Sequence, residues 1–163
     1  MNVTADISKT KPDTGIILPK HVCFVCTGNT CRSPMAAALF NKIATERNLD
    51  VRIESAGIFA NENDTATTEA VVAVKKYGID LLGHHAQMIN SELIEKSDLI
   101  LTMTEAHKML MSQATDKVYT ICEYAGEDGE VADPFGGDVA EYEECAEQIY
   151  GLCSKIADKI EEK

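Results

Sequence analysis

Short apolar runs alternate along the chain with longer segments in which apolar residues recur every three or four positions. Runs bounded by Gly, Pro, Asn or Asp are typical of buried strands. Spaced patterns such as Met35, Leu39 and Ile43 place apolar side chains along one face of a helix. We therefore expect strands at 21–25, 51–57, 99–103 and 117–121, and helices at 33–47, 65–77, 104–111 and from 137 or 138 toward 163, with a short helix starting at 90 or 91.

This alternation predicts an α/β fold, a three-layer sandwich in which helices flank a central parallel sheet of about four strands. Residues 1–20 are expected to form an N-terminal extension and residues 21–163 a single domain. Ligands of open parallel sheets bind beyond the carboxyl ends of the strands. The segment 26–33, which follows the first strand, is therefore the expected position of a functional site, and the Gly- and Asp-rich loop at 123–138 is long enough to contribute to it.

The segment after the first strand combines a thiol, a guanidinium and small polar residues: Cys26, Thr27, Gly28, Asn29, Thr30, Cys31, Arg32 and Ser33. A short loop between a strand and a helix directs backbone N–H groups to one point, where the helix dipole adds to the positive field. Gly28 and Asn29 tolerate the left-handed backbone that such a loop needs. Ser33 is expected to cap the following helix, with Pro34 in its first turn.

These groups suit the transfer of a phosphoryl group. The positive field favours the reactive thiolate form of Cys26. The planar guanidinium of Arg32 matches phosphate oxygens, and Ser33 can donate a hydrogen bond to the sulfur. A thiolate in contact with a bound phosphate predicts attack on phosphorus and a phosphocysteine intermediate.

Composition adds limits on partners and location. Hydrophobic residues make up 45% of the chain and charged residues 26%, and no apolar run is long enough to cross a membrane. The first 20 residues lack the apolar stretch of a secretory signal, so a cytoplasmic location is expected. The net charge of −12 argues against nucleic acid and anionic membranes as partners, because both are bound largely through Lys and Arg. The sequence leaves the oligomeric state open, and a monomer is the simpler expectation.

Six cysteines allow other interpretations. Cys23, Cys26 and Cys31 lie close together as in a zinc site, but the later cysteines supply no second pair at matched spacing. Cys23 and Cys26 also have the spacing of a thioredoxin-type pair, which would begin a helix, whereas Cys23 is expected inside a strand as a packing residue. No metal or organic cofactor is implied, because loop amides and Arg32 can neutralise a phosphate.

The residues from Val25 to Met35 resemble the phosphate loop of the low-molecular-weight protein-tyrosine phosphatases. The similarity continues through 55–57, 78–86, 97–103 and 133–135, and it is greater still to the bacterial protein-arginine phosphatase branch. The resemblance implies the fold of that family and a chain that hydrolyses phosphorylated side chains of protein substrates. It favours phosphoarginine as the substrate, with phosphotyrosine as the alternative.

The resemblance also implies three catalytic roles. Cys26 would be the nucleophile, Arg32 the phosphate clamp, and Asp133 the general acid that protonates the leaving group and then activates water. Asp133 precedes Pro134, and by local pattern alone it would be a turn residue. The remaining loop residues and Phe135 would bind the substrate, with Phe135 as an aromatic wall.

A supporting hydrogen-bond network is implied as well, formed by Asn29, Ser33, Ser55 and His84. Without the resemblance, His84 would be interpreted as a structural histidine. His85 and His107 are interpreted as surface or packing residues.

Thr30 and Cys31 of the loop bear on specificity and regulation, and two further positions, Gln87 and Ala37, depart from the family pattern. Thr30 stands where tyrosine-specific members commonly have Ile, and its hydroxyl suits a guanidinium better than a phenyl ring. Gln87 stands where those members often have Arg, and Ala37 where many relatives have Glu. Cys31 is implied to form a disulfide with Cys26 under oxidation, which would protect the nucleophile reversibly.

Two further function classes are less favoured. Arsenate reductases share the loop but need further thiols in a later segment, and no cysteine lies between Cys31 and Cys122. A non-catalytic phosphoprotein-binding module would be expected to have lost Cys26, Arg32 or Asp133.

Overall fold

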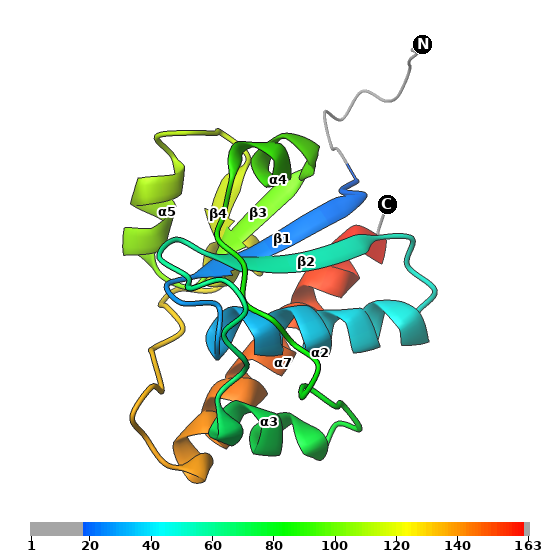
Figure 1. Ribbon diagram of the computed structural model, residues 1–163. Helices are drawn as coiled ribbons and strands as arrows, with labels where there is room; N and C mark the ends of the chain where they lie inside the picture. Colours follow the sequence, from blue (N-terminus) through cyan, green and yellow to red (C-terminus); the bar gives the residue numbers. More distant parts are fainter. Residues whose placement is uncertain (1–17, 162–163) are drawn as a thin grey trace.

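The centre of the molecule is a four-stranded parallel sheet (Figure 1), seen in a computed structural model that describes residues 18–161. The strand order is β2-β1-β3-β4. Val22 of β1 pairs with Ile53 on one side and with Leu99 on the other, so β1 is an inner strand. The bounds are β1 (His21–Cys26), β2 (Arg52–Gly57), β3 (Leu99–Thr102) and β4 (Val118–Thr120).

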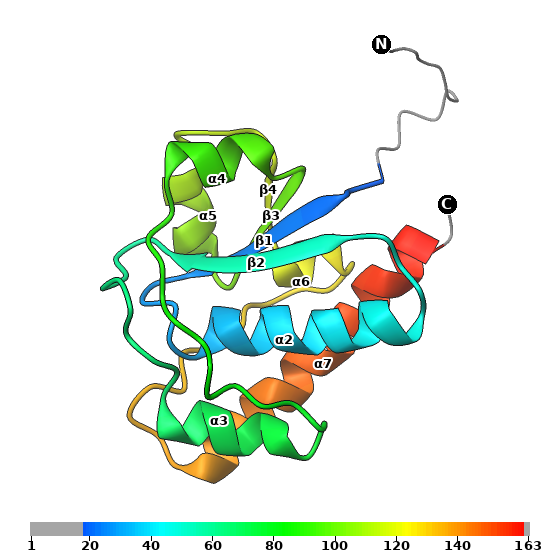
Figure 2. The same cartoon turned by 45° about the vertical axis from the view of Figure 1, so that its right-hand side comes forward.

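Helices cover both faces of the sheet, which confirms the predicted three-layer α/β sandwich. Figures 1 and 2 show α2 and α7 along one face, with α3 outside them, and α4 and α5 on the other. The bounds are α2 (Arg32–Glu46), α3 (Thr68–Lys75), α4 (Ser91–Lys96), α5 (Glu105–Met111), α6 (Ile121–Tyr124) and α7 (Val139–Glu161).

The side chains of β1 alternate between two hydrophobic cores, because successive residues of a strand point to opposite faces. Phe24 packs into the larger core toward α2 and α7, where its ring meets Phe40 edge-on at 5.8 Å. Cys23 and Val25 pack into the smaller core beneath α4 and α5. All six residues of β1 are buried, so the segment that follows the strand starts from a rigid support.

Several element ends differ from the sequence expectations for local reasons. α2 begins at Arg32 after the cap residue Cys31, and no side chain caps it, so the expected cap at Ser33 is wrong. The chain after β4 forms the short helix α6, because Thr120 and Glu123 make a reciprocal capping box. The expected extension at 1–20 lies outside the described residues except for 18–20.

β2 ends against the loop that follows β1, and only a glycine fits there. A Cβ at Gly57 would lie 2.6 Å from the Thr27 carbonyl oxygen and 3.0 Å from the Asn29 nitrogen. The neighbouring backbone bonds the same loop, because the Phe59 N–H donates to that Thr27 carbonyl at 2.9 Å. The shape of the loop is therefore fixed partly from β2.

Substituting Gly57→Ala should lower the free energy of unfolding by about 2 kcal/mol, because the added methyl overlaps backbone atoms that cannot move freely. Gly151→Ala is the matched control: it lies within α7, where a Cβ meets nothing within 4 Å. That change should raise stability by about 0.5–1 kcal/mol, since Ala favours helix over Gly. Urea unfolding of both variants measures the two changes in the free energy of unfolding. If both variants lost the same stability, the close contact at Gly57 would not be the cause.

Candidate active site

The candidate site lies beyond the carboxyl end of β1, where the chain passes through 26–33 into α2. β2 follows β1 on one side and β3 lies on the other, so this is the switch point at which ligands of parallel sheets bind. The pocket has a volume of about 230 Å³. It is lined by Cys26, Thr27, Gly28, Thr30, Cys31, Arg32, Asp133 and Phe135.

The sulfur of Cys26 lies at the end of β1 with only 2% of the residue exposed. Its Sγ is 2.9 Å from Ser33 Oγ. Ser33 Oγ in turn accepts a hydrogen bond from Asn29 Nδ2 at 2.8 Å. A hydroxyl that accepts from Asn29 keeps its own proton, which can be donated to the sulfur. Ser33 Oγ is therefore bonded to Asn29 and Cys26 rather than to the helix end, which explains why the expected cap is absent.

Asn29 ties the loop to two other segments. It is fully buried and adopts left-handed backbone, with φ of 57°. Its Nδ2 also donates to Ser55 Oγ at 2.9 Å, and its Oδ1 accepts from the Gln87 N–H at 3.0 Å. The His84 Nε2–H donates to the Asn29 carbonyl at 2.7 Å, and burial lowers the pKa of His84. The expected network of Asn29, Ser33, Ser55 and His84 is thus assembled in the structure.

Gln87 belongs to this network, although it was not predicted as a member. Its N–H holds Asn29, and its side-chain Nε2 donates to the Ser55 carbonyl at 2.9 Å. From the sequence it was noted only as a position where tyrosine-specific relatives often have Arg. A contact between residues so far apart in sequence as Asn29 and Gln87 is visible only in the folded chain.

Arg32 and Asp133 meet across the pocket. Arg32 is 4% exposed, and its Nη1 donates to the Val131 carbonyl at 3.0 Å. Its Nη2 lies 3.5 Å from Asp133 Oδ2. The buried Arg32 Nε finds no partner among residues 18–161, so a donor is left for an anion beside the sulfur. Asp133 Oδ1 accepts from the Phe135 N–H at 3.1 Å and from the Cys31 thiol at 3.8 Å.

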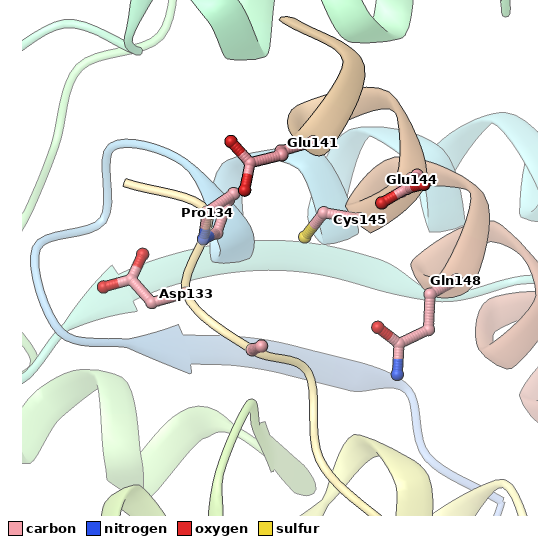
Figure 3. A pocket seen from close by; sticks show the side chains of 7 residues that line it. Asp133, Pro134, Glu141, Glu144, Cys145 and Gln148 are labelled. Atoms are coloured by element: carbon pink, nitrogen blue, oxygen red, sulfur yellow. The ribbon is translucent and has the colours of Figure 1, made fainter. Parts of the chain in front are cut away.

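Helix α7 supports the loop that carries Asp133. Behind this loop lies a second pocket of about 210 Å³, whose walls include Pro134, Glu141, Cys145 and Gln148 (Figure 3). Gln148 Nε2 donates to the Glu130 carbonyl at 3.0 Å, which fixes the start of the loop. Glu141 and Asp138 bond reciprocally at 3.0 Å and fix its end.

The thiols around the site are unequal. All six cysteines are buried and free. Burial, together with the nearby Cys26 and Asp133, raises the pKa of Cys31 to about 12, so Cys31 stays a thiol at neutral pH. Burial likewise raises the pKa of Cys23 to about 12 and that of Cys145 to about 11. The oxidative pairing of Cys26 with Cys31 stays a prediction.

The remaining expected site residues lie around the pocket. Gly28 and Thr30 are half-buried in its wall, and Phe135 is 71% exposed at its rim. His107 was interpreted as a surface or packing residue, yet its Nε2 lies 2.9 Å from Thr27 Oγ1. The signal that could have found it is its place on the first turn after β3, at the same sheet edge as the loop.

Within residues 18–161, no group of three or more His, Cys, Asp and Glu side chains could hold a metal ion. Among the helices of the same residues, none combines the length and the apolar character needed to cross a membrane.

Comparison with known proteins gives a consistent result. The family model described as low molecular weight phosphotyrosine protein phosphatase matches residues 21–163. The chain is 42% identical to a protein-arginine-phosphatase of Bacillus subtilis, over 85% of this chain and 95% of the relative. It is 37% identical to the low molecular weight protein-tyrosine-phosphatase PtpB of Staphylococcus haemolyticus, over 83% and 96%. A solved mutant of the YwlE arginine phosphatase with a phosphorylated active-site serine has a TM-score of 0.83 at 41% identity, over 86% and 95%.

Two asparagines with the same backbone test the network around Asn29. Asn29 and Asn48 both have φ of 57°, but Asn48 is exposed. Asn48→Ala should cost about 1 kcal/mol, the strain of a left-handed alanine. Asn29→Ala should cost about 3 kcal/mol or more, because it also leaves Ser33, Ser55 and the Gln87 N–H without their partner. Urea unfolding compares the two, and equal losses would show that the side-chain bonds contribute little.

Stability should fall in mildly acidic solution because of two histidines. Burial lowers the pKa of His84 and of His107 below the ordinary 6.5, for His107 with help from the charge of Arg32. The unfolded chain therefore binds protons that the folded chain does not, and the free energy of unfolding decreases as pH falls from about 7 toward 5. Urea unfolding across this range measures the slope. His107→Gln should reduce it, whereas His85→Gln, at an exposed position, should not.

Proposed function

This chain belongs to the low molecular weight phosphotyrosine protein phosphatase family, and we propose that it hydrolyses phosphorylated arginine side chains of proteins through a phosphocysteine intermediate. One observation supports this most directly. The sulfur of Cys26, the guanidinium of Arg32 and the carboxyl of Asp133 line one small pocket, with a hydroxyl donor 2.9 Å from the sulfur.

In the first step the loop amides and Arg32 bind the oxygens of the phosphoryl group. The unpartnered Nε of Arg32 and its Nη2 supply two donors for this purpose. The thiolate of Cys26 attacks phosphorus, and an S–P bond forms as the P–N bond to the guanidine breaks. Asp133 gives its proton to the leaving nitrogen, because an unprotonated guanidine anion would leave poorly.

In the second step water replaces the departed side chain. Asp133, now a carboxylate, takes a proton from this water as its oxygen attacks phosphorus. The S–P bond breaks, inorganic phosphate is released, and the electron pair returns to sulfur. The Ser33 hydroxyl stabilises the thiolate that leaves, since the bond from Asn29 keeps the Ser33 proton directed away from the amide.

Thr30 is the proposed determinant of the substrate, and Phe135 contributes to its binding. Thr30 places a hydroxyl in the pocket wall, where it can accept from a guanidinium N–H. Phe135 forms an exposed aromatic face at the rim, against which a guanidinium plane can stack. The identity of 42% to a protein-arginine-phosphatase supports this choice. Phosphotyrosine is the alternative, supported by the 37% identity to PtpB.

The other function classes fit the site less well. The later cysteines, Cys122, Cys145 and Cys153, are all buried, so a thiol relay of the kind an arsenate reductase needs has little support. Cys26, Arg32 and Asp133 are all present and adjacent, which does not suit a binding module without catalysis. We further propose phosphorylated proteins as the partners, the cytoplasm as the location, and residues 21–163 as a single domain.

Thr30→Ile should change the substrate preference. Replacing the hydroxyl by an ethyl-bearing apolar side chain removes a partner for the guanidinium and adds packing for a phenyl ring. The ratio of kcat/KM on phosphoarginine peptides to that on phosphotyrosine peptides should fall about 10-fold or more. Steady-state kinetics on both peptides measures the ratio, and an unchanged ratio would remove Thr30 as a determinant.

Cys26→Ser is the control for the mechanism. It should lower turnover of both peptides about 10³-fold or more, because the hydroxyl is a far weaker nucleophile than the thiolate. Turnover that survives this change would refute the covalent intermediate. Activity of the unaltered protein on phosphotyrosine alone would instead overturn the choice of phosphoarginine.

A further inference from the structure

His107 is a buried histidine that the proposed mechanism does not use. It lies on the first turn of α5, directly after β3, and 7% of the residue is exposed. Its own N–H donates to the cap residue Thr104 at 3.2 Å, which fixes the base of the side chain. Its ring then reaches the phosphate loop, where Nε2 lies 2.9 Å from Oγ1 of Thr27, the residue after the nucleophile.

The buried surroundings select one form of the ring. Nδ1 of His107 is buried and has no hydrogen-bond partner among the described residues. A buried N–H without an acceptor is rarer and costlier than an acceptor without a donor. The proton therefore lies on Nε2, which donates to Thr27 Oγ1, and Nδ1 is the unprotonated nitrogen, an acceptor without a donor.

The ring is also held uncharged. Burial lowers the pKa of His107, and so does the charge of Arg32 from α2, while Asp133 and Glu130 of the loop before α7 act in the opposite direction. The result is a neutral donor beside the guanidinium. A second cation at this position would repel Arg32, whereas a neutral N–H does not.

Thr27 is held at two points. Its carbonyl accepts from the Phe59 N–H at 2.9 Å, and its hydroxyl oxygen accepts from His107. A hydroxyl that accepts one bond still has a proton to donate. Thr27 is exposed and lines the pocket that contains Cys26 and Arg32. Its hydroxyl proton can therefore point into this pocket.

We propose that His107 is a positioning residue, whose Nε2–H bond to Thr27 Oγ1 turns the Thr27 hydroxyl proton toward the phosphoryl group bound in the loop. The inference rests on the proposed phosphatase function, and it adds a side-chain donor to the loop amides and Arg32. It acts on every phosphoryl substrate alike, because Thr27 belongs to the phosphate loop and not to the part of the pocket that holds the leaving group.

A double-mutant cycle tests the bond. With p-nitrophenyl phosphate as substrate, His107→Leu and Thr27→Val should each lower kcat/KM about 10-fold, through loss of one donor to a charged group. The combined variant should lose no more than either change alone, since both remove the same donor. His107→Gln should stay within about 3-fold of the unaltered protein, because the glutamine amide nitrogen can replace Nε2 as donor to Thr27. His85→Leu, at an exposed position, is the matched control and should leave turnover unchanged.

Orthovanadate, which imitates the phosphoryl transition state, gives a second measurement. Its inhibition constant should rise in His107→Leu by about the same factor as kcat/KM falls. Imidazole ¹⁵N spectra should show the proton of His107 on Nε2, and the Nε2 signal should shift when vanadate binds to the unaltered protein but not to Thr27→Val. A merely structural histidine would give no such dependence on Thr27.

Several results would overturn the inference. One is a normal kcat/KM for His107→Leu. Another is a combined variant in which His107→Leu lowers kcat/KM by the same factor whether or not Thr27 has been changed to Val. A third is a spectrum with the proton on Nδ1. If His107→Leu does not fold, the activity of His107→Gln and the spectra of the unaltered protein still test the bond between His107 and Thr27. Failure of the proposed function would look different: the unaltered protein would turn over no phosphorylated substrate, while the spectra and vanadate binding would still report on the bond.

Discussion

The reactive loop depends on one buried side chain, the amide of Asn29. Four hydrogen bonds meet at this residue, two from its Nδ2, one to its Oδ1 and one to its carbonyl. They hold a left-handed backbone that a branched side chain would resist, and they leave the Ser33 proton for the sulfur. Because Asn29 is fully buried, water cannot replace a lost partner, so the bonds act as a set. The geometry of the loop is therefore held by the packed network behind it, together with the backbone contacts from the end of β2.

A strongly acidic protein builds a positive site by local means. The net charge is −12, yet the pocket receives the loop amides, the start of α2 and a guanidinium that is 4% exposed. A low-dielectric environment strengthens these nearby groups, whereas solvent screens the distant surface carboxylates. Burial also raises the pKa of Cys31 to about 12, so Cys31 stays a thiol at neutral pH. Burial thus strengthens the local positive field and keeps the Cys31 thiol uncharged.

The sequence predicted what depends on neighbours along the chain. The strand before Cys26, the helix after Ser33 and the anion site between them follow from local pattern, and the structure has the same strand and helix within a residue or two. Contacts between distant segments could not be derived in this way. Asp133 was assigned to the site from sequence only through a family resemblance. Gln87 was noted only as a departure from the family pattern and His107 only as a surface or packing residue, because their contacts with the loop join segments distant in sequence. The cap assigned to Ser33 failed because Ser33 lies inside α2, after the cap residue Cys31, and its hydroxyl is engaged by Asn29 and Cys26 instead of the helix end.

The position of Thr30 limits how selective this pocket can be. A site that must hydrogen-bond its substrate rejects an apolar analogue strongly when the polar group is left buried and unpaired. Thr30 is only half-buried, so water can satisfy its hydroxyl when a phenyl ring occupies the pocket. The rim adds little discrimination, because the face of Phe135 accepts a phenyl ring as readily as a guanidinium plane. A phosphoarginine preference built on these two residues is therefore graded. Larger selectivity has to come from the protonation step, in which Asp133 must reach a guanidine nitrogen instead of a phenolic oxygen.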